Sequence, residues 1–498
     1  MLVFSYLKLQ KMKYINKITC INGRSFIFVL GMFLLSGCSD FLEEVPKSNI
    51  TSSNYYNNEK DAEAAVTYAY QDLNAIYNLD YWLIGDIASD NFTLSTAGLG
   101  SGQSADFGLF SWSSSTSVVG SFWNSHFNAI TNVNAALDKI QNIEGNEEFL
   151  AELMGELYFL RALYYYNLVR VYGDVPIILT LLTASDNLNV SRDNAADVYL
   201  QIIGDLNQAI EILPELPREL GRTSELVAKA LLAKVYLTRA SSPYVENSEN
   251  DYAHVISLCD DIIGSGYFAL VPNYLDIFKT TNELKNSESL FEVQFADNVS
   301  NLSSTIINQF LLSIDFTNPI SVWQAQPSDD FVNNMEPGDI RALFVSDTTL
   351  TGFEMTDGRW LTKYQDVEEF GLDLNTGPNF YVLRYSEVLL MLAEAENEVN
   401  GPTAKAIAAV NSIRNRAGLS DLPNTSISQK NNLRDAILQE RRIEFIGEGQ
   451  RWFDLVRTGR LVMTMNNLGL TIDDRRNIFP IPLTEMDANS AMIQNEGY

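Results

Sequence analysis

The chain has 498 residues and a formal net charge of −29, from 63 Asp and Glu against 34 Lys and Arg. This acidity disfavours binding to nucleic acid or to an anionic membrane surface, because like charges repel. With only 2 His, the chain has almost no material for His-rich zinc sites or Ser-His-Asp triads. Hydrophobic residues make up 46% and can fill a core, and the length predicts two lobes or a stacked helical array.

Residues 1–37 have the order of a bacterial signal sequence. Basic residues come first, and the apolar run at 26–35 is too short to cross a membrane, which takes about 20 residues. The tetrapeptide LSGC, which ends at Cys38, resembles a lipobox and predicts cleavage before Cys38 and acylation of its sulfur. The alternative is an ordinary secretory cut that leaves Cys38 as a free thiol. Cleavage removes five basic residues and no acid, so the formal charge falls from −29 to −34.

Most of the remaining chain shows the helical period, with apolar residues at i, i+3 and i+4. Gly and Pro separate the periodic segments, because both residues end helices. In three hairpins small residues alternate with Leu and Tyr, which is typical of tetratricopeptide-like packing, although the period is irregular and a generic helical bundle is the alternative. Helices are predicted at 59–78, 121–143, 147–172, 193–213, 223–240, 251–264, 384–399, 402–417, 427–447 and 451–458.

Two polar stretches interrupt this pattern. The loop at 95–120 is rich in Gly and Ser, and segment 266–383 is rich in small polar residues around SLFEVQF, which predicts a short strand. We therefore divide the mature chain into an N-terminal helical scaffold at 38–265, an irregular loop-rich lobe at 266–383 and a C-terminal helical part at 384–498. Loops carried on a rigid scaffold are the usual place for recognition.

Three glutamates recur at a spacing of four residues in QERRIEFIGEGQRWFDL: Glu440, Glu444 and Glu448. Paired carboxylates would fit a glycosidase. Nearby arginines should keep their pKa values low, however, which suits ion pairing and not a general acid. We therefore expect a structural ion network and no catalytic residue; the arginines are Arg441, Arg442, Arg451 and Arg457.

Sequence motifs spread over most of the mature chain point to a known family. They are LRYSEVLLMLAEAENEVNG, AVNSIRNRAGL, ILQERRIEFIGEGQRWFDLVRTG and the ending IFPIPLTEMDANSAMIQNEGY, with the lipobox, RALYYYNLVRVYGDVP and PSDDFVNNMEPGDIRALF before them. Together they resemble the SusD/RagB family of outer-membrane nutrient-binding lipoproteins. The resemblance implies an all-α fold, a tetratricopeptide-like scaffold of helical hairpins with an inserted loop-rich lobe that contains short strands. It also implies a lid on a SusC-like TonB-dependent transporter at the outer membrane.

Sugar binding needs flat aromatic faces and polar side chains that bond to hydroxyl groups. We therefore look for aromatic residues in polar loops rather than in helical stripes. Core packing is the alternative for each tryptophan, and the stronger one for Trp82. The candidate glycan-binding residues are Trp82, Asp90, Asn91, Trp112, Trp323 and Gln324.

The sequence gives little support for a metal site, a cofactor site or a reactive thiol. The many loop acids leave calcium open, but no stretch has the regular D-x-D-x-D-G spacing of a calcium loop, so we expect no metal and no cofactor. Cys259 lies in a helical apolar pattern, where a buried, inert thiol is expected. His126 and His254 are expected to be structural.

Two functions remain open. The first is a non-catalytic, lipid-anchored protein of the cell surface that captures a glycan and delivers it to a TonB-dependent transporter. The second is a lid subunit of the same kind of transporter that captures a peptide or another small nutrient. A surface hydrolase is disfavoured by the scarcity of His and by the arginines around the motif carboxylates.

Overall fold

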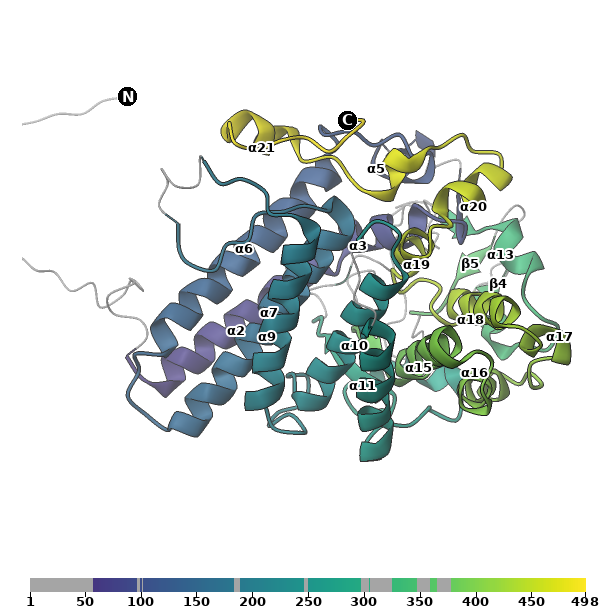
Figure 1. Ribbon diagram of the computed structural model, residues 1–498, viewed down its shortest axis with the longest axis horizontal. Coiled ribbons are helices and arrows are strands. Elements are labelled where there is room, and N and C mark those ends of the chain that lie inside the picture. Colours follow the sequence, from purple (N-terminus) through teal and green to yellow (C-terminus); the bar gives the residue numbers. More distant parts are fainter. Residues whose placement is uncertain are drawn as a thin grey trace, which may run out of the picture. The chain divides into compact units, whose positions relative to one another are not determined.

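Helices dominate the part of the chain that the structure describes, which confirms the predicted all-α class (Figure 1). The computed structural model describes residues 57–95, 99–100, 102–182, 189–245, 250–296, 304, 325–346, 359–364 and 378–498. The predicted signal sequence and Cys38 lie outside these ranges. Within them, every helix is either too short or too polar to cross a membrane.

The N-terminal helices pack around α7, which spans Glu147–Tyr172. The Asn146 side chain caps its first turn, and Gly173, with a φ of 72°, ends it. All residues from 159 to 172 are buried, as expected for a helix that is apolar or aromatic on nearly every face. The tyrosine hydroxyls tolerate burial because they find acceptors: Tyr164 donates to the carbonyl of Ala69 at 2.7 Å. The helices around α7 are α2 (Glu59–Ile76), α6 (Ser117–Ile140) and α9 (Ala195–Ile212).

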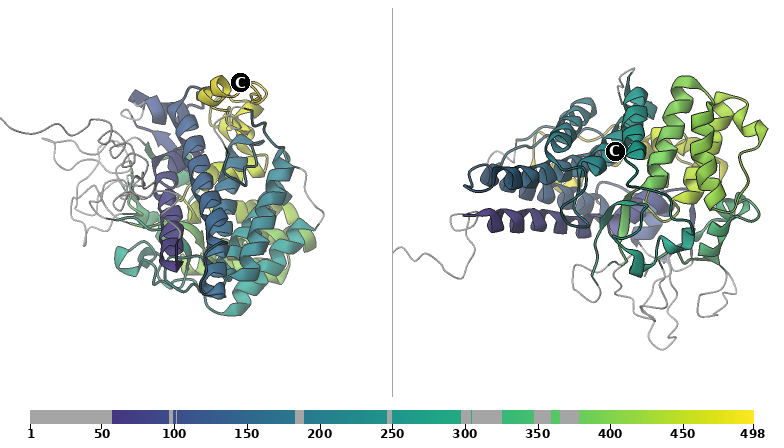
Figure 2. Two further views of the ribbon diagram at one scale, coloured as in Figure 1. Left: turned by 90° about the vertical axis from the view of Figure 1, so that its left-hand side faces the viewer. Right: turned by 90° about the horizontal axis from the view of Figure 1, so that it is seen from below.

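Further helical hairpins continue the array (Figures 1 and 2). Helix α10 (Glu225–Ser241) packs on α9 and on α11 (Asp251–Ser265), and α11 packs on α15 (Tyr385–Asn400). Helix α15 in turn contacts α16 (Ala404–Arg416) and α18 (Lys430–Glu444). Buried aliphatic side chains fill the space between these last three helices; they include Leu390, Val410, Ile413, Leu433 and Ile437.

Three two-stranded antiparallel sheets lie among the described residues. Strand β1 (Phe92–Leu94) pairs with β3 (Ala325–Pro327), and β4 (Val345–Ser346) pairs with β5 (Trp360–Leu361). Strand β2 (Ser289–Val293), which SLFEVQF predicted, pairs with β6 (Phe380–Arg384) directly before α15. The β1–β3 pair fastens the loop-rich segment to the N-terminal helical part, while the other two pairs lie within that segment up to the start of α15. Residues 56–498 form one compact unit.

Short helices complete the chain. They are α3 (Leu79–Trp82), the π-helix η2 (Leu83–Ile87), α5 (Gly102–Gly108), α13 (Asp329–Asn333), α17 (Asn424–Ile427), α19 (Arg451–Arg457), α20 (Leu461–Asn467) and α21 (Leu483–Ala488), with 3₁₀ turns η3 (Tyr274–Asp276), η4 (Thr280–Asn282), η5 (Ile340–Phe344) and η6 (Asp474–Asn477).

Two sequence-based boundaries need correction. The stretch 95–120 is not all loop, because it contains α5 and α6 already begins at Ser117. The helix predicted at 427–447 ends at Glu444, so Glu448 does not continue the helical face of Glu440 and Glu444. The cause is local: Gly447 and Gly449 follow with φ values of 78° and 66°, which a right-handed helix cannot contain.

Candidate ligand-binding site

The β1–β3 ladder joins the strand that follows Asp90 and Asn91 to a strand that begins at Ala325, far away in sequence. Leu94 pairs with Ala325, and the turn after β3 is bonded to the turn before β1. The N–H of Ser328 donates to the carbonyl of Asn91 at 2.8 Å, and its hydroxyl donates to the carbonyl of Asp90 at 2.6 Å. The two segments therefore share one small, bonded platform.

Trp323 and Gln324 lie outside the described residues. The chain that carries them joins β3 at Ala325, opposite Leu94. Their role in ligand binding therefore stays a prediction. What the structure describes is the strand β3, which directly follows them in sequence.

Asp90 and Asn91 are buried, at 3% and 1% exposure, and arginines hold both. Arg451 donates to the two oxygens of the Asp90 carboxylate, from Nε at 2.7 Å and from Nη2 at 2.8 Å. Arg442 donates from Nε to Oδ1 of Asn91 at 3.0 Å. Burial alone would raise the pKa of Asp90, but Arg451 and Arg442 outweigh it and lower that pKa. The structure thus gives both residues the task of anchoring the platform to the C-terminal helices.

Trp82 lies in the core with no exposed surface. Its ring meets that of Phe92 edge to face, with 6.0 Å between the centroids. The indole therefore packs against the first residue of β1 in the core, which is the packing role that the sequence already favoured for it.

Trp112 is also buried, at 1% exposure, although its local sequence is polar. Phe479 stacks on it with a centroid distance of 4.5 Å and an angle of 12°, and Phe107 stacks at 5.6 Å. The indole Nε1 donates to the hydroxyl of Tyr498 at 3.0 Å, and the Arg476 guanidinium lies 4.9 Å from the ring. Because the chain itself occupies these surfaces, we no longer expect a sugar ring to stack on Trp112.

The motif glutamates form a buried ion network. Glu444 accepts from Arg416 Nη2 at 2.5 Å, from Arg384 Nη1 at 3.0 Å and from Arg341 Nη1 at 3.1 Å. Burial opposes ionisation of Glu444, but these three guanidinium groups, together with Lys363, lower its pKa far below the usual value. The expected ion network is therefore confirmed for Glu444.

Two details of that network differ from expectation. Burial raises the pKa of Glu440 even though Arg341 donates to it at 2.6 Å. Glu448 pairs with Arg384 and Lys363, which come from other parts of the chain. The arginines next to the glutamates in sequence bond mainly to other acids instead: Arg441 to Asp454, Arg442 to Asp330, Arg451 to Asp90 and Arg457 to Glu394.

The histidines and the cysteine are packed side chains. Burial lowers the pKa of His126 to about 3, so its imidazole is neutral at physiological pH. His254 stacks on Tyr236 with a centroid distance of 4.8 Å. Cys259 is a buried free thiol whose pKa is raised by burial, which confirms the expected inert role.

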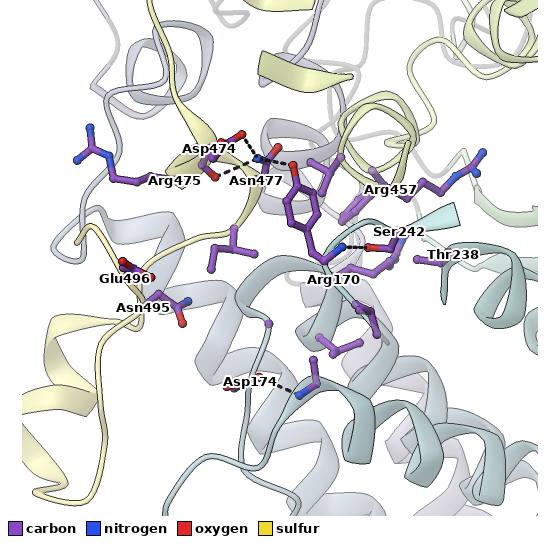
Figure 3. Close-up of a pocket in the computed structure, with 18 of the residues that line it drawn as sticks. Arg170, Asp174, Thr238, Ser242, Arg457, Asp474, Arg475, Asn477, Asn495 and Glu496 are labelled. Carbon is purple, nitrogen blue, oxygen red and sulfur yellow. Dashed lines mark hydrogen bonds between the residues drawn. The ribbon is translucent and has the colours of Figure 1, made fainter. Parts of the chain in front are cut away.

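A cavity that the sequence did not predict lies between α7, α9, α10, α19 and the C-terminal segment (Figure 3). Its volume is about 550 Å³, and its polar wall includes Asp474, Asn477 and Asn495. The only local signal is the polar run DDRRN at 473–477, and nothing in that run indicates that it faces α7 and α10.

Comparison with known proteins places this geometry in a family. Residues 312–498 match the model described as SusD family, and residues 40–237 match the model described as starch-binding associating with outer membrane. The SusD-like protein P2 of Formosa agariphila is 28% identical, over 95% of this chain and 99% of its own length.

Solved structures give the same result. A laminarin-binding SusD-like protein superimposes with a TM-score of 0.76 at 26% identity, covering 89% of this chain and 100% of its own. A SusD superfamily protein from Parabacteroides distasonis gives a TM-score of 0.77 at 27% identity, covering 90% of this chain and 100% of its own. The two family matches, in both halves of the chain, and the shared fold show that this chain belongs to the SusD/RagB family.

Proposed function

We propose that the mature chain is a lipid-anchored protein of the outer-membrane surface that captures an oligosaccharide without cleaving it and delivers it to a SusC-like TonB-dependent transporter. The observation that carries the proposal is the β1–β3 platform. It pairs β1 with the strand that follows the predicted contacts Trp323 and Gln324 in sequence, and buried arginines of the C-terminal part hold Asp90 and Asn91 directly before β1. A rigid base of this kind lowers the conformational entropy that the attached segments lose when a ligand binds.

The comparisons support a glycan as the ligand. One matching family model is described as starch-binding, and one similar solved structure is a laminarin-binding protein. Capture without catalysis agrees with the motif carboxylates, which are held in ion pairs with arginines rather than set out as an acid and a base.

Membrane attachment rests on the lipobox before Cys38. Several acyl chains together hold a folded domain stably on a bilayer, whereas one chain does not. Cys38→Ser should abolish incorporation of labelled palmitate and release the protein from the membrane fraction. Retention of the label in Cys38→Ser would contradict the anchor.

The test of ligand capture is retardation of the chain from Ser39 onward in native gels cast with plant, host and microbial polysaccharides. Retardation by one or two of them, without release of reducing ends, is the expected result. Release of reducing ends would overturn the non-catalytic assignment. A folded protein that no polysaccharide retards would instead indicate capture of a peptide or another small nutrient.

A further inference from the structure

Arg170 differs from the other buried arginines of the structure. Ten arginines among the described residues are buried, and nine of them pair with a carboxylate. Arg170, at 8% exposure, pairs with no carboxylate in the described ranges. A guanidinium stays charged in a protein, and a buried charge without a counter-charge is costly. An anionic group from a ligand would therefore compensate a charge that the chain leaves unpaired.

The chain occupies only part of the Arg170 guanidinium. The ring centroids of Tyr166 and Phe453 lie 4.0 and 3.9 Å from it. Its Nε donates to the carbonyl of Tyr166 at 3.2 Å, and its Nη2 donates to Oδ1 of Asn167 at 2.6 Å. Its Nη1 makes no hydrogen bond to any described residue and, unlike the unbonded Nη1 of Arg441, is not sealed from solvent. This nitrogen can therefore donate to a ligand.

The space that Arg170 lines is the cavity of Figure 3. Its volume of about 550 Å³ lies within the usual range for small-molecule pockets. Tyr199, Phe453 and Val456 add aromatic and apolar surface to the wall, and Tyr244, which is 49% exposed, adds a further ring. A ligand with an apolar body can bury surface on this wall while a polar end reaches Arg170.

Tyr199 supplies a second donor to the same cavity. The residue is 2% exposed, yet its hydroxyl makes no hydrogen bond to any residue in the described part of the chain and is not sealed from solvent. Burial raises the pKa of Tyr199, and the positive charge of Arg170 opposes this rise, so the two side chains interact electrostatically. A guanidinium N–H and a phenol O–H are both suitable donors to a carboxylate.

The wall holds three arginines and three carboxylates, so its net charge selects neither an anion nor a cation. Asp474, Arg475 and Glu496 are exposed, where solvent and salt screen their charges. Asp174 is already engaged, because its Oδ1 accepts a hydrogen bond of 2.8 Å from the first N–H of α9. Selectivity in this cavity therefore depends on the buried, unpaired guanidinium of Arg170.

We propose that this cavity binds a small molecule with a carboxylate on an apolar or ring-shaped body. The carboxylate accepts from Nη1 of Arg170 and from the hydroxyl of Tyr199, while the body packs on Phe453 and Val456. A neutral amide of the same shape gains no charge interaction, and an ammonium compound meets Arg170 with a like charge. The proposal is independent of glycan capture at the β1–β3 platform.

The experiment compares phenylacetate with phenylacetamide, which have nearly the same shape and differ in charge. Each is titrated by calorimetry into the folded chain from Ser39 onward at pH 7. We expect phenylacetate to bind at least about tenfold more tightly, because it alone compensates the charge of Arg170. Equal affinities, or no binding of phenylacetate by the folded protein, would overturn the proposal.

Tyr199→Phe tests the second donor. The variant removes only a hydroxyl that makes no hydrogen bond to the described residues, so the fold should be kept. We expect phenylacetate binding to weaken by about threefold to tenfold, which is the usual contribution of one hydrogen bond. The matched control is Tyr158→Phe, which removes a hydroxyl from α7 outside the cavity and should leave the affinity unchanged. Wild-type affinity in Tyr199→Phe would contradict the site.

Arg170→Met tests the charge while keeping a long side chain against the two rings. Its affinity for phenylacetate should fall at least about tenfold, to that for phenylacetamide, whose own affinity should stay near the wild-type value. The matched control is Arg218→Gln, which removes an exposed arginine outside the cavity and should change neither affinity. An equal fall for both probes in Arg170→Met, or a loss of the same size in Arg218→Gln, would contradict a contact between Arg170 and the carboxylate.

Discussion

The backbone N–H of Gly449 donates to the carboxylate of Asp86 at 2.6 Å, across 363 residues of sequence. Gly447 donates to the same carboxylate at 3.4 Å. The approach needs glycine on both sides, because a Cβ on Gly85 would collide with the Gly449 backbone, and one on Gly449 would lie 2.5 Å from the Tyr81 ring. The turn after α18 is thereby fastened to η2, directly before the platform.

This contact predicts a pH-dependent stability. Burial raises the pKa of Asp86 from 3.8 to about 7, despite its two backbone donors. The folded state therefore holds this proton more tightly than the unfolded state, so the stabilisation is present at about pH 4 and is lost as the pH rises through about 7. We expect the free energy of unfolding of Asp86→Asn to fall less between pH 5 and 8 than that of the wild type, by roughly 2 to 4 kcal/mol. Urea unfolding at a series of pH values measures this difference.

Glu156 provides an internal comparison. Its burial outweighs the neighbouring Arg222 and raises its pKa to about 7 as well. Asp86→Asn should therefore retain part of the pH dependence, and Glu156→Gln should remove a separate part. The same pH dependence in the wild type and in both variants would contradict the role of these two carboxyl groups.

The Asp90–Arg451 pair should be costly to break. Both of its bonds are below 3 Å, at 2.7 and 2.8 Å, and both side chains are buried. Asp90→Asn removes the charge that compensates Arg451, and loss of one member of a buried pair costs about 3 to 5 kcal/mol. Asp435→Asn is the control, because Asp435 pairs with Arg460 at the surface, where such pairs contribute under about 1 kcal/mol. Similar small losses of unfolding free energy in both variants would show that the platform is fixed by other contacts.

The helices were predictable because their signals are local. The sequence predicted a helix at 147–172, and the structure has α7 at Glu147–Tyr172, since an Asn cap and a following Gly stand beside an apolar stretch. The end of α18 was misplaced because the helical period continues into a segment where two glycines take positive φ. Local sequence signals therefore predict which segments form helices. The errors fall where the backbone conformation of single residues decides where a helix ends.

Ion-pair and packing partners that come from distant parts of the sequence were not predictable in the same way. The arginines beside Glu444 in sequence do not bond to it, whereas Arg384 and Arg416 arrive from β6 and α16. Trp112 has a polar local sequence that indicates exposure, yet Phe479 covers one of its faces. Spacing along one segment cannot reveal a partner that tertiary packing supplies from elsewhere.

Trp112 should therefore contribute to stability rather than directly to binding. Its ring is packed against two phenylalanine rings, so Trp112→Ala should lower the free energy of unfolding by about 3 to 5 kcal/mol, with a smaller loss in Trp112→Phe. Urea unfolding checks the order of the three proteins. If Trp112→Ala kept its stability but lost binding to the polysaccharide that retards the wild type, this result would contradict the packing role and assign the indole to the ligand site.

Trp323 and Gln324 are the remaining candidates for ligand contact, on the segment that enters β3. Loss of an aromatic stacking surface costs roughly 1 to 3 kcal/mol for nucleic-acid bases, and we expect Trp323→Ala to weaken polysaccharide binding by a similar amount. Gln324→Ala, which removes hydrogen bonds to hydroxyl groups, should cost about 0.5 to 1.5 kcal/mol. Affinity electrophoresis over a range of polysaccharide concentrations gives both values.

The control is Trp323→Phe, which keeps an aromatic face and should retain most of the affinity. Trp323→Leu, in turn, keeps an apolar side chain but has no flat ring. Comparing Trp323→Phe with Trp323→Leu therefore separates ring stacking from the bulk of an apolar side chain. Unchanged affinity in Trp323→Ala and Gln324→Ala would reject both assignments. The ligand would then have to contact other residues, and the meeting of β1 and β3 would serve only to hold the fold together.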